Sequence, residues 1–110
     1  MALTRKPVHQ SRPSGTLAVT LYQPAAGVTD DLRIRIVRNS GVTGSATFNL
    51  YHDIDGTTFD ADSEITPPLT LSDGDQYTEE RVSADENGAI GFKTSVANAL
   101  TITIWSLQES

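Results

Sequence analysis

The sequence has no cysteine, and it has a single methionine and a single tryptophan among its 110 residues. Without cysteine, disulfide bonds and thiolate metal sites are excluded. No apolar run approaches the roughly 20 residues that a membrane-spanning helix needs, and no apolar stretch follows the early basic residues Arg5 and Lys6. We therefore expect one domain with neither a membrane span nor a secretory signal.

Positive charge is scarce beyond the first 15 residues. The formal net charge is −6, from eight basic and fourteen acidic residues. Residues 1–15 carry three of the basic residues and no acidic one, so five basic and fourteen acidic residues remain for the rest of the chain, a net charge of −9. Neutralisation of phosphates by basic groups supplies most of the affinity of nucleic-acid binders. The acidic body therefore predicts no nucleic-acid partner.

Residues 1–15 also lack the signals of regular structure. Pro7, Pro13 and Gly15 interrupt the segment, and its apolar residues show no periodicity. The segment is predicted to be an extended basic arm that precedes a β domain at residues 16–110. Such an arm is either a disordered tail or a segment that orders on a partner or on its own domain. The candidate partner-binding residues of the arm are Arg5, Lys6, His9 and Arg12.

No segment shows ten residues of helical period, and from residue 16 onward the apolar residues alternate with a period of two, which indicates strands. Leu17, Val19 and Leu21 are expected to share one inward face. The later strands are expected to place further apolar residues inward, namely Leu32, Ile34, Ile36, Ala46, Phe48, Leu50, Ile90, Phe92, Leu100, Ile102 and Ile104. The predicted strands cover residues 16–22, 32–39, 45–54, 69–71, 76–83, 89–94 and 100–107. Short strands separated by frequent turn signals predict an all-β fold, an antiparallel β-sandwich or jelly-roll-like domain.

Two stretches depart from this simple pattern. Residues 57–68 are acidic and end in two prolines, which predicts a long loop with a short edge strand near residues 64–66. Trp105 and Leu107 fall on the opposite parity from the inward residues of the last strand. Either a bulge shifts the register there, or both faces of this strand are covered.

The sequence offers little for catalysis. The two histidines, His9 and His52, are the only bases of the pKa class that nucleophilic catalysis uses. His9 lies in the arm, and His52 lies on the outward parity of its strand, where a plain surface role accounts for it. No serine lies in a Gly-x-Ser-x-Gly turn, and no glycine-rich loop is built to hold a phosphate. We therefore expect a non-enzymatic protein without a cofactor.

Four aspartates resemble fragments of a calcium-binding loop. They are Asp53, Asp55, Asp60 and Asp62. The full spacing of a calcium loop with its terminal glutamate is not met, and the dipeptide at residues 55–56 is also a typical hairpin turn. No metal is expected, and these four residues are the candidate ligands if calcium binds.

A basic stripe marks the strand at residues 32–39. Arg33, Arg35 and Arg38 are predicted to share one face of it. In one interpretation they pair with acids of a neighbouring strand, with Glu79 or Glu80 as the partners. In the other, Arg33 and Arg35 form an interface with an acidic partner, because arginine is enriched at protein interfaces.

Several short motifs together suggest a family. The run GTLAVTLYQPAAG at residues 15–27 is followed by Arg38-Asn39, by Thr47–Leu50 with alternating apolar character, by Leu71–Asp75, and by Leu100–Ile104. Over residues 15–108 this pattern resembles small β-sandwich structural proteins of tailed bacteriophages. The arm lies outside the resemblance.

The resemblance implies a component of the virion, assembled in the cytoplasm of a bacterial host, with no catalytic residues. The first hypothesis is a capsid decoration (cement) protein that binds major capsid subunits through its arm and one sheet face, as a homo-oligomer, either a dimer or a trimer. A subunit of the tail, neck or fibre is the neighbouring alternative. A carbohydrate- or receptor-binding module, with exposed Tyr51, Tyr77 or Trp105 as a stacking platform, is a further one, and burial of Trp105 in the core would weaken it.

Overall fold

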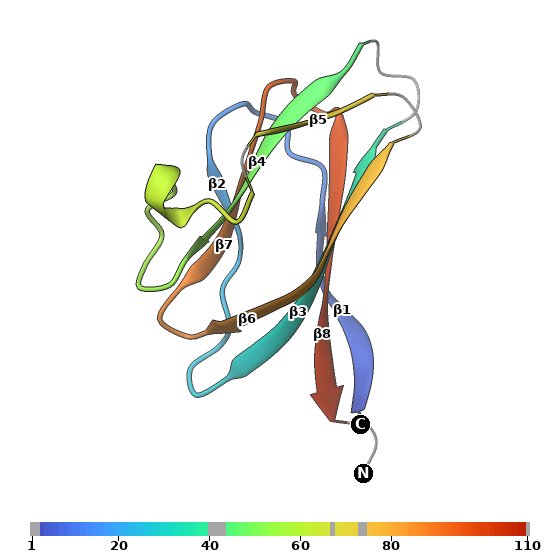
Figure 1. Cartoon of the computed structure of the whole chain (residues 1–110). Coiled ribbons are helices and arrows are strands. Elements are labelled where there is room, and N and C mark those ends of the chain that lie inside the picture. The colour runs from blue at the N-terminus through green and yellow to red at the C-terminus, as the bar shows by residue number, and fades with distance from the viewer. Residues whose placement is uncertain (1–2, 40–43, 67, 73–74, 110) are drawn as a thin grey trace.

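The computed structural model describes residues 3–39, 44–66, 68–72 and 75–109, which form two antiparallel four-stranded sheets in two layers (Figure 1). Sheet A has the strand order β1-β8-β3-β6, and sheet B has the order β2-β7-β4-β5. The strands are β1 (Leu3–Ser11), β2 (Val19–Tyr22), β3 (Thr29–Arg38), β4 (Ala46–Asp53), β5 (Leu69–Leu71), β6 (Gln76–Asp85), β7 (Ala89–Thr94) and β8 (Leu100–Glu109). A single 3-10 turn, η1 (Ala61–Ser63), lies between β4 and β5, and the described residues contain no α-helix. The all-β prediction is confirmed.

The core lies between the two sheets and is filled by the alternate residues of the central strands. Its fully buried side chains include Leu32, Ile34 and Ile36 of β3, Phe48 and Leu50 of β4, Ile90 and Phe92 of β7, and Leu100, Ile102 and Ile104 of β8. The rings of Phe48 and Phe92 stack with their centroids 5.9 Å apart. Alternation in the sequence assigned these residues to the interior because successive side chains of a strand point to opposite faces, and this assignment is confirmed.

The first strand corrects the prediction that residues 1–15 hold no regular element. Residues 3–11 are extended, as expected, but they pair antiparallel with β8 along the edge of sheet A, from Leu3 opposite Glu109 to Ser11 opposite Ile102. The register shifts between Pro7 and His9. Proline is tolerated at a sheet edge and at a bulge because no ladder hydrogen bond is then lost. Most of the predicted arm is thus a strand of the domain itself.

The second strand is shorter than predicted. It begins at Val19 rather than at residue 16, and only Leu21 of the three expected core residues is buried. Leu17 is 80% exposed and Val19 is 40% exposed, so neither is buried as expected, although the register aligns Val19 with the buried Phe92 on the inward side of sheet B. Leu17 lies in the connection that crosses from sheet A to sheet B, and β2 is an edge strand with a neighbour on one side only. The alternation of apolar residues in the sequence shows neither where a connection crosses between sheets nor which strand lies at an edge.

The acidic segment between β4 and β5 also differs from the prediction. In place of an edge strand at residues 64–66, the structure has η1 followed by one isolated bridge between Tyr51 and Glu64. Asp60 caps η1 by accepting a hydrogen bond from the backbone N–H of Asp62, while the Ser63 hydroxyl accepts one from the N–H of Asp60. Capping of this kind fixes a short turn within the predicted loop, and the single bridge at Glu64 is the part of the expected edge strand that the described residues form.

Candidate functional site

The solvent-facing side of sheet A is the candidate site, and we call it the outer face of sheet A. Because Leu32, Ile34 and Ile36 fill the core, the residues between them project outward. The register aligns Arg33 of β3 with Trp105 of β8, and Trp105 with Pro7 of β1. The face therefore brings part of the predicted arm, at Arg5 and Pro7, beside the arginine strand, whereas the register aligns Lys6 and His9 with the core-side residues Ser106 and Ile104.

Trp105 is the centre of this outer face. The ladder between β3 and β8 runs without a register shift from Leu32 opposite Ser106 to Arg38 opposite Leu100. No bulge therefore moves Trp105 inward, and its side chain is half-buried on the solvent side of the sheet. The neighbouring Ser106 is fully buried on the core side. The parity change at Trp105 thus marks an outward-facing aromatic residue.

The two arginines of β3 are exposed, as predicted. Arg35 donates a hydrogen bond from Nε to Oε1 of Gln76, at 3.0 Å. The register aligns Glu79 with Ile34 rather than with an arginine, and Glu79 accepts a hydrogen bond from the hydroxyl of Tyr77 at 2.6 Å. The side chain of Glu80, the other predicted partner, lies outside the described residues.

Arg38 does not belong to this stripe. It is 4% exposed, so its predicted place on the same outer face as Arg33 and Arg35 is wrong. Its guanidinium donates to the carbonyl oxygens of Asn39 and Gly44. The reason is parity, because residue 38 is an odd number of positions from residues 33 and 35 and so projects to the opposite side of the strand.

A small charge network closes one end of the outer face. Asp31 of β3 forms an ion pair with Arg5 of β1 at 3.5 Å and another with Arg81 of β6 at 2.9 Å. Nη1 of Arg5 also donates to the backbone carbonyl of Asp31 at 2.6 Å. Arg5 therefore ties the first strand to β3 across β8, which is a structural role beside its predicted role in partner binding.

The other residues of the predicted arm are distributed along the same edge. His9 shares a hydrogen bond with the hydroxyl of Ser11, and burial lowers the pKa of His9 below its ordinary value. Arg12 donates to the carbonyl of Asn98 at 2.7 Å. Lys6 is exposed and has no hydrogen bond or ion pair with another described residue. Of the four arm residues, Lys6 has the side chain most available to a partner.

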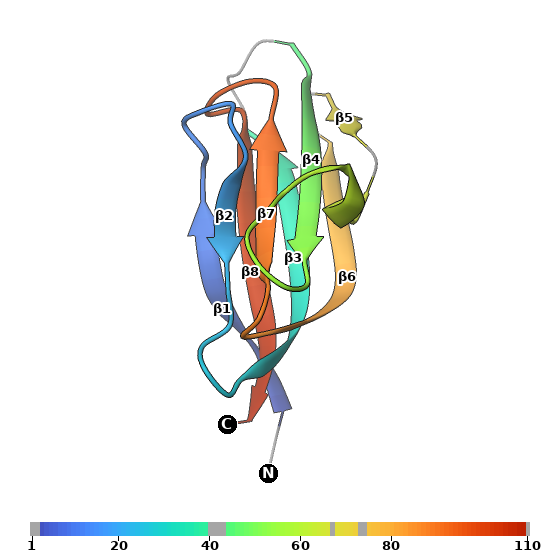
Figure 2. The same ribbon diagram turned by 90° about the vertical axis from the view of Figure 1, so that its left-hand side faces the viewer.

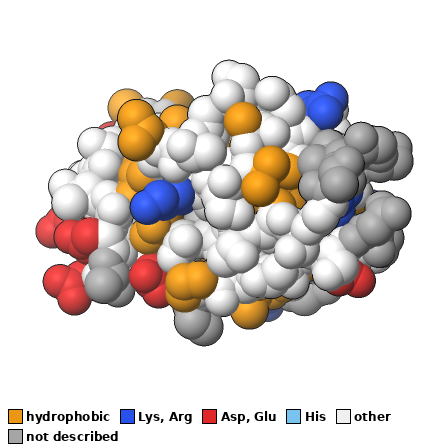
Figure 3. Space-filling model, turned by 90° about the horizontal axis from the view of Figure 1, so that it is seen from above, with side chains coloured by type: hydrophobic (Ala, Val, Ile, Leu, Met, Phe, Trp, Pro, Cys, Tyr) orange, Lys and Arg blue, Asp and Glu red, His pale blue; other side chains and the backbone are white. Residues whose placement is uncertain are grey.

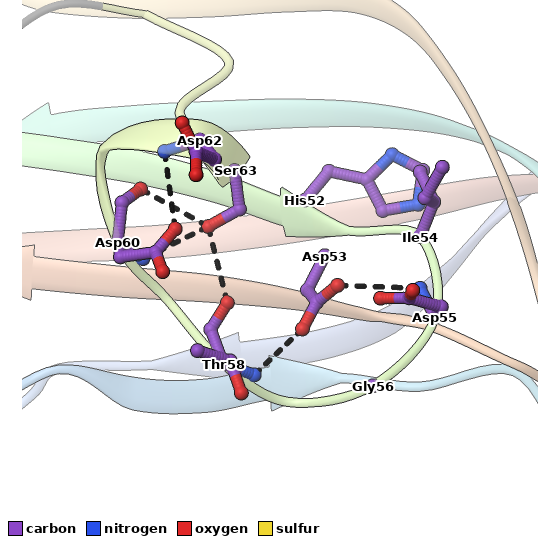
Figure 4. Close-up of a pocket in the computed structure, with 9 residues that line it drawn as sticks. All are labelled: His52, Asp53, Ile54, Asp55, Gly56, Thr58, Asp60, Asp62 and Ser63. Atoms are coloured by element: carbon purple, nitrogen blue, oxygen red, sulfur yellow. Dashed lines mark hydrogen bonds between the residues drawn. The ribbon is translucent and has the colours of Figure 1, made fainter.

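The acidic segment after β4 surrounds a separate hollow of about 470 Å³ (Figure 4). Its lining is His52, Asp53, Ile54, Asp55, Gly56, Thr58, Asp60, Asp62 and Ser63. The two oxygens of Asp53 accept hydrogen bonds from the backbone N–H groups of Asp55 and Thr58. The hollow is open to solvent, and the Asp53 carboxylate helps to hold the loop that forms it.

The four candidate calcium ligands all line this hollow. Asp53 and Asp60 accept backbone hydrogen bonds from their own loop. A side-chain hydrogen bond with Asp55, followed by the backbone N–H groups of Thr58 and Asp55, lowers the pKa of Asp53. Across the described residues, no group of three or more His, Asp or Glu side chains is placed to hold a metal ion. The carboxylates of Asp53 and Asp60 cap turns of this loop.

Two potential catalytic groups lie in the hollow without forming a catalytic pair. The Ser63 hydroxyl donates to the carbonyl oxygens of Thr58 and Asp60, and the described residues offer His52 no hydrogen-bond partner. Burial lowers the pKa of His52, while Asp85 and Asp53 oppose that shift. A nucleophile must be hydrogen-bonded to its base to be activated in this way, and these two groups are not.

One local arrangement escaped the sequence prediction. The ring of Phe59 stacks on Tyr51, with centroids 5.7 Å apart, and covers Gly91 of β7. A Cβ at residue 91 would come within 2.5 Å of the Phe59 ring. A lone glycine inside a predicted strand is the signal that could have indicated this close approach.

Charge is unevenly distributed over the molecule. Seen from above, the Asp and Glu side chains gather mainly at the side where Figure 1 shows η1, and hydrophobic side chains appear as separate small groups (Figure 3). Exposed large apolar residues are Leu17, Val19, Val28 and Ile54. No helix in the described ranges is long and apolar enough to cross a membrane.

Comparisons with protein-family models, with curated proteins and with solved structures find no match to this chain. Its function must therefore be argued from the arrangement of its own residues.

Proposed function

We propose that this chain is a non-enzymatic structural protein of a tailed-bacteriophage virion, a capsid decoration protein that binds major capsid subunits through β1 and the outer face of sheet A. The observation that carries the proposal is the alignment of Trp105 between Pro7 and Arg33 on that face. Tryptophan and arginine are the residue types that most often dominate binding energy at protein interfaces. The resemblance of its short sequence motifs to small phage structural proteins gives the proposal its biological setting.

The strand order supports the finer description of the fold as a jelly roll. The pairs β1–β8, β2–β7, β3–β6 and β4–β5 are nested like one long hairpin that has been rolled up, and consecutive strands alternate between the sheets except at β4 and β5, which pair within sheet B. Jelly rolls occur in viral capsid proteins and in lectins. A fold by itself does not fix a function, so this support is secondary to that of the outer face.

A carbohydrate- or receptor-binding role is the second candidate. The position of Trp105 favours it, because this residue lies on the solvent side of sheet A and not in the core. An indole ring presented on a flat sheet face can stack on a sugar ring as well as pack against a protein. Tyr51 is 6% exposed beneath Phe59, so it is a poor candidate for the same purpose.

The test locates the chain and then maps its contact face. Virions from the bacterial strain that encodes the chain are purified, and the chain is sought in the intact particles by mass spectrometry and by immunogold labelling. Particles prepared without the chain are then mixed with purified wild-type protein, with Trp105→Ala and with Arg33→Ala/Arg35→Ala. Lys93→Ala is the matched control, because Lys93 is exposed on sheet B.

We expect labelling on the capsid, wild-type rebinding, and a loss of about thirtyfold in affinity for Trp105→Ala, the effect of one strong interface residue. Labelling confined to the tail would move the attachment site to the tail, neck or fibre. Absence of the chain from the particles would overturn the virion proposal. The second candidate would then be established if the wild-type protein binds to a glycan array and Trp105→Ala does not.

A further inference from the structure

The two edges of sheet A are long and open on opposite sides of the molecule. In the part of the chain that the structure describes, β1 pairs only with β8 and β6 pairs only with β3. Figure 2 shows β1 on one side of the molecule and β6 on the other. An edge strand presents a row of unpaired N–H and C=O groups, which is a template for pairing with another chain.

These two edges carry opposite charge. Strand β1 has two basic residues, Arg5 and Lys6, and no acidic one. Strand β6 has three acidic residues, Glu79, Glu80 and Asp85, against one basic residue. Opposite charges across a strand pair stabilise it, and like charges directly opposite destabilise it.

The lengths and directions of the two edges also match. Strand β1 has nine residues and β6 has ten. Each neighbouring pair in sheet A is antiparallel, so β1 and β6 of one chain run in opposite directions. If the β1 edge of one copy is placed beside the β6 edge of the next, without inverting the molecule, the new strand pair is antiparallel. The sheet then continues across the junction with the same alternation of strand directions.

We propose that β6 of one copy pairs with β1 of a second copy of this chain, so that sheet A continues from one subunit into the next. This contact is heterologous, because it joins two different surfaces, and it builds a ring if the rotation closes and a filament if it does not. The pairing uses the strand edges and leaves Trp105 on the outer face, so it does not depend on the proposed attachment to a capsid.

Symmetric alternatives fit these edges less well. A two-fold pairing of β1 with β1 brings Arg5 and Lys6 of both copies into one ladder, and a pairing of β6 with β6 concentrates the acidic residues. The edges of sheet B are short, with four residues in β2 and three in β5. Short edge strands offer little to pair with.

Lys6 and Pro7 limit which strands can pair with β1. Lysine and proline on an edge strand discourage indiscriminate pairing. Pro7 has no N–H to donate, so the new ladder relies on the other backbone groups of β1. Lys6 is exposed and unpaired among the described residues, so a strand of negative charge is the partner that satisfies it.

The first experiment measures self-association of the purified full chain by sedimentation velocity over a concentration series. We expect association that weakens as salt rises from about 0.05 M to about 0.5 M, because exposed charge pairs are screened. Lys6→Glu and Glu79→Lys should each weaken association about tenfold or more, since like charges then meet at the junction. Lys93→Glu, the same reversal on sheet B, should leave it unchanged.

Mixing the two variants distinguishes a head-to-tail contact from a symmetric one. The carboxylate that Lys6→Glu introduces on β1 complements the ammonium group that Glu79→Lys introduces on β6, and the remaining two edges keep their original charges. An equimolar mixture should therefore recover association that neither variant shows alone. Thermal melts of each variant check that it is folded.

A second measurement does not depend on charge reversal. Because the chain has no cysteine, Lys6→Cys and Thr78→Cys introduce single thiols on β1 and β6 for a flexible bis-maleimide cross-linker. We expect covalent dimers from a mixture of the two variants and a ladder of products from the double variant. Cross-linking of Lys6→Cys with itself alone would show a two-fold β1 contact and overturn the proposal, as would a chain that stays monomeric at millimolar concentration in low salt.

Discussion

The hydroxyl of Tyr22 donates a hydrogen bond to Oδ2 of Asp30 at 2.6 Å, and this contact joins sheet B to sheet A. The other carboxylate oxygen of Asp30 accepts a hydrogen bond from the Ser106 hydroxyl, also at 2.6 Å. Asp30 is 3% exposed and Ser106 is fully buried, whereas Tyr22 is half-buried. A buried carboxylate is retained only where hydrogen bonds or opposite charges compensate its loss of hydration.

Asp30→Ala is therefore expected to destabilise the fold by about 3 kcal/mol or more, because each hydrogen bond to a charged group contributes about 1.5–3 kcal/mol and its loss leaves a buried donor without a partner. Asp30→Asn keeps one acceptor oxygen and should cost less. Urea unfolding followed by circular dichroism measures both. The exposed Asp62 provides the control substitution Asp62→Ala, and a wild-type midpoint for Asp30→Ala would contradict the prediction.

The two tyrosines beside carboxylates should make the fold sensitive to alkali. Burial, followed by the hydrogen bond to Asp30, raises the pKa of Tyr22 from 10.0 to about 12, and burial with the hydrogen bond to Glu79 raises the pKa of Tyr77 to about 12. The fold favours the neutral phenols. Their contribution to stability is therefore complete below pH 10 and is lost as the pH rises through 12. Phenolate absorbance gives the two pKa values, and urea midpoints across this range give the loss.

Tyr22→Phe and Tyr77→Phe isolate the source of this alkaline loss. Each variant removes one titrating group, so its unfolding free energy should decline less steeply between pH 10 and 12 than that of the wild type. An unchanged slope in both variants would show that other groups cause the alkaline sensitivity.

The histidines should produce the opposite dependence in acid. Burial lowers the pKa of His9 and of His52 from 6.5, so the fold favours the neutral imidazoles. Their contribution to stability is present above pH 6.5 and is lost as the pH falls through the lowered values. Titration of the imidazole signals by NMR should give midpoints below 6.5 for both residues, and His52→Gln should reduce the acid sensitivity.

Because Phe59 contacts Gly91, the stability effect of a substitution at one of these positions should depend on the residue at the other. Gly91→Ala should destabilise the protein by about 1–3 kcal/mol, because the added methyl group displaces the ring from a closely packed position. In a Phe59→Ala background the same substitution should cost much less, since the obstructing ring is gone. A thermodynamic cycle measured by thermal melts tests this coupling. Gly15→Ala is the control, because a Cβ there meets nothing within 4 Å.

How far the sequence predicted the candidate site depends on the residue. The alternation of β3 correctly placed Arg33 and Arg35 outside and Ile34 inside. The parity change at Trp105 was noticed, but two explanations remained open until the continuous ladder with β3 excluded a bulge at that position. The sequence did not predict that the arm and the arginine strand lie in one sheet, because this depends on β8 pairing with both β1 and β3.

The sequence by itself determined which residues alternate and therefore which side chains of the central strands fill the core. The tertiary structure alone decided which strands are neighbours, which of them lie at edges, and that residues 3–11 join a sheet at all. The physical reason is that a period of two reports the two faces of a strand, whereas its neighbours are set by contacts between distant residues, such as Leu3 with Glu109. Burial follows from those contacts, and so Leu17, in a connection between the sheets, and Val19, on an edge strand, are exposed.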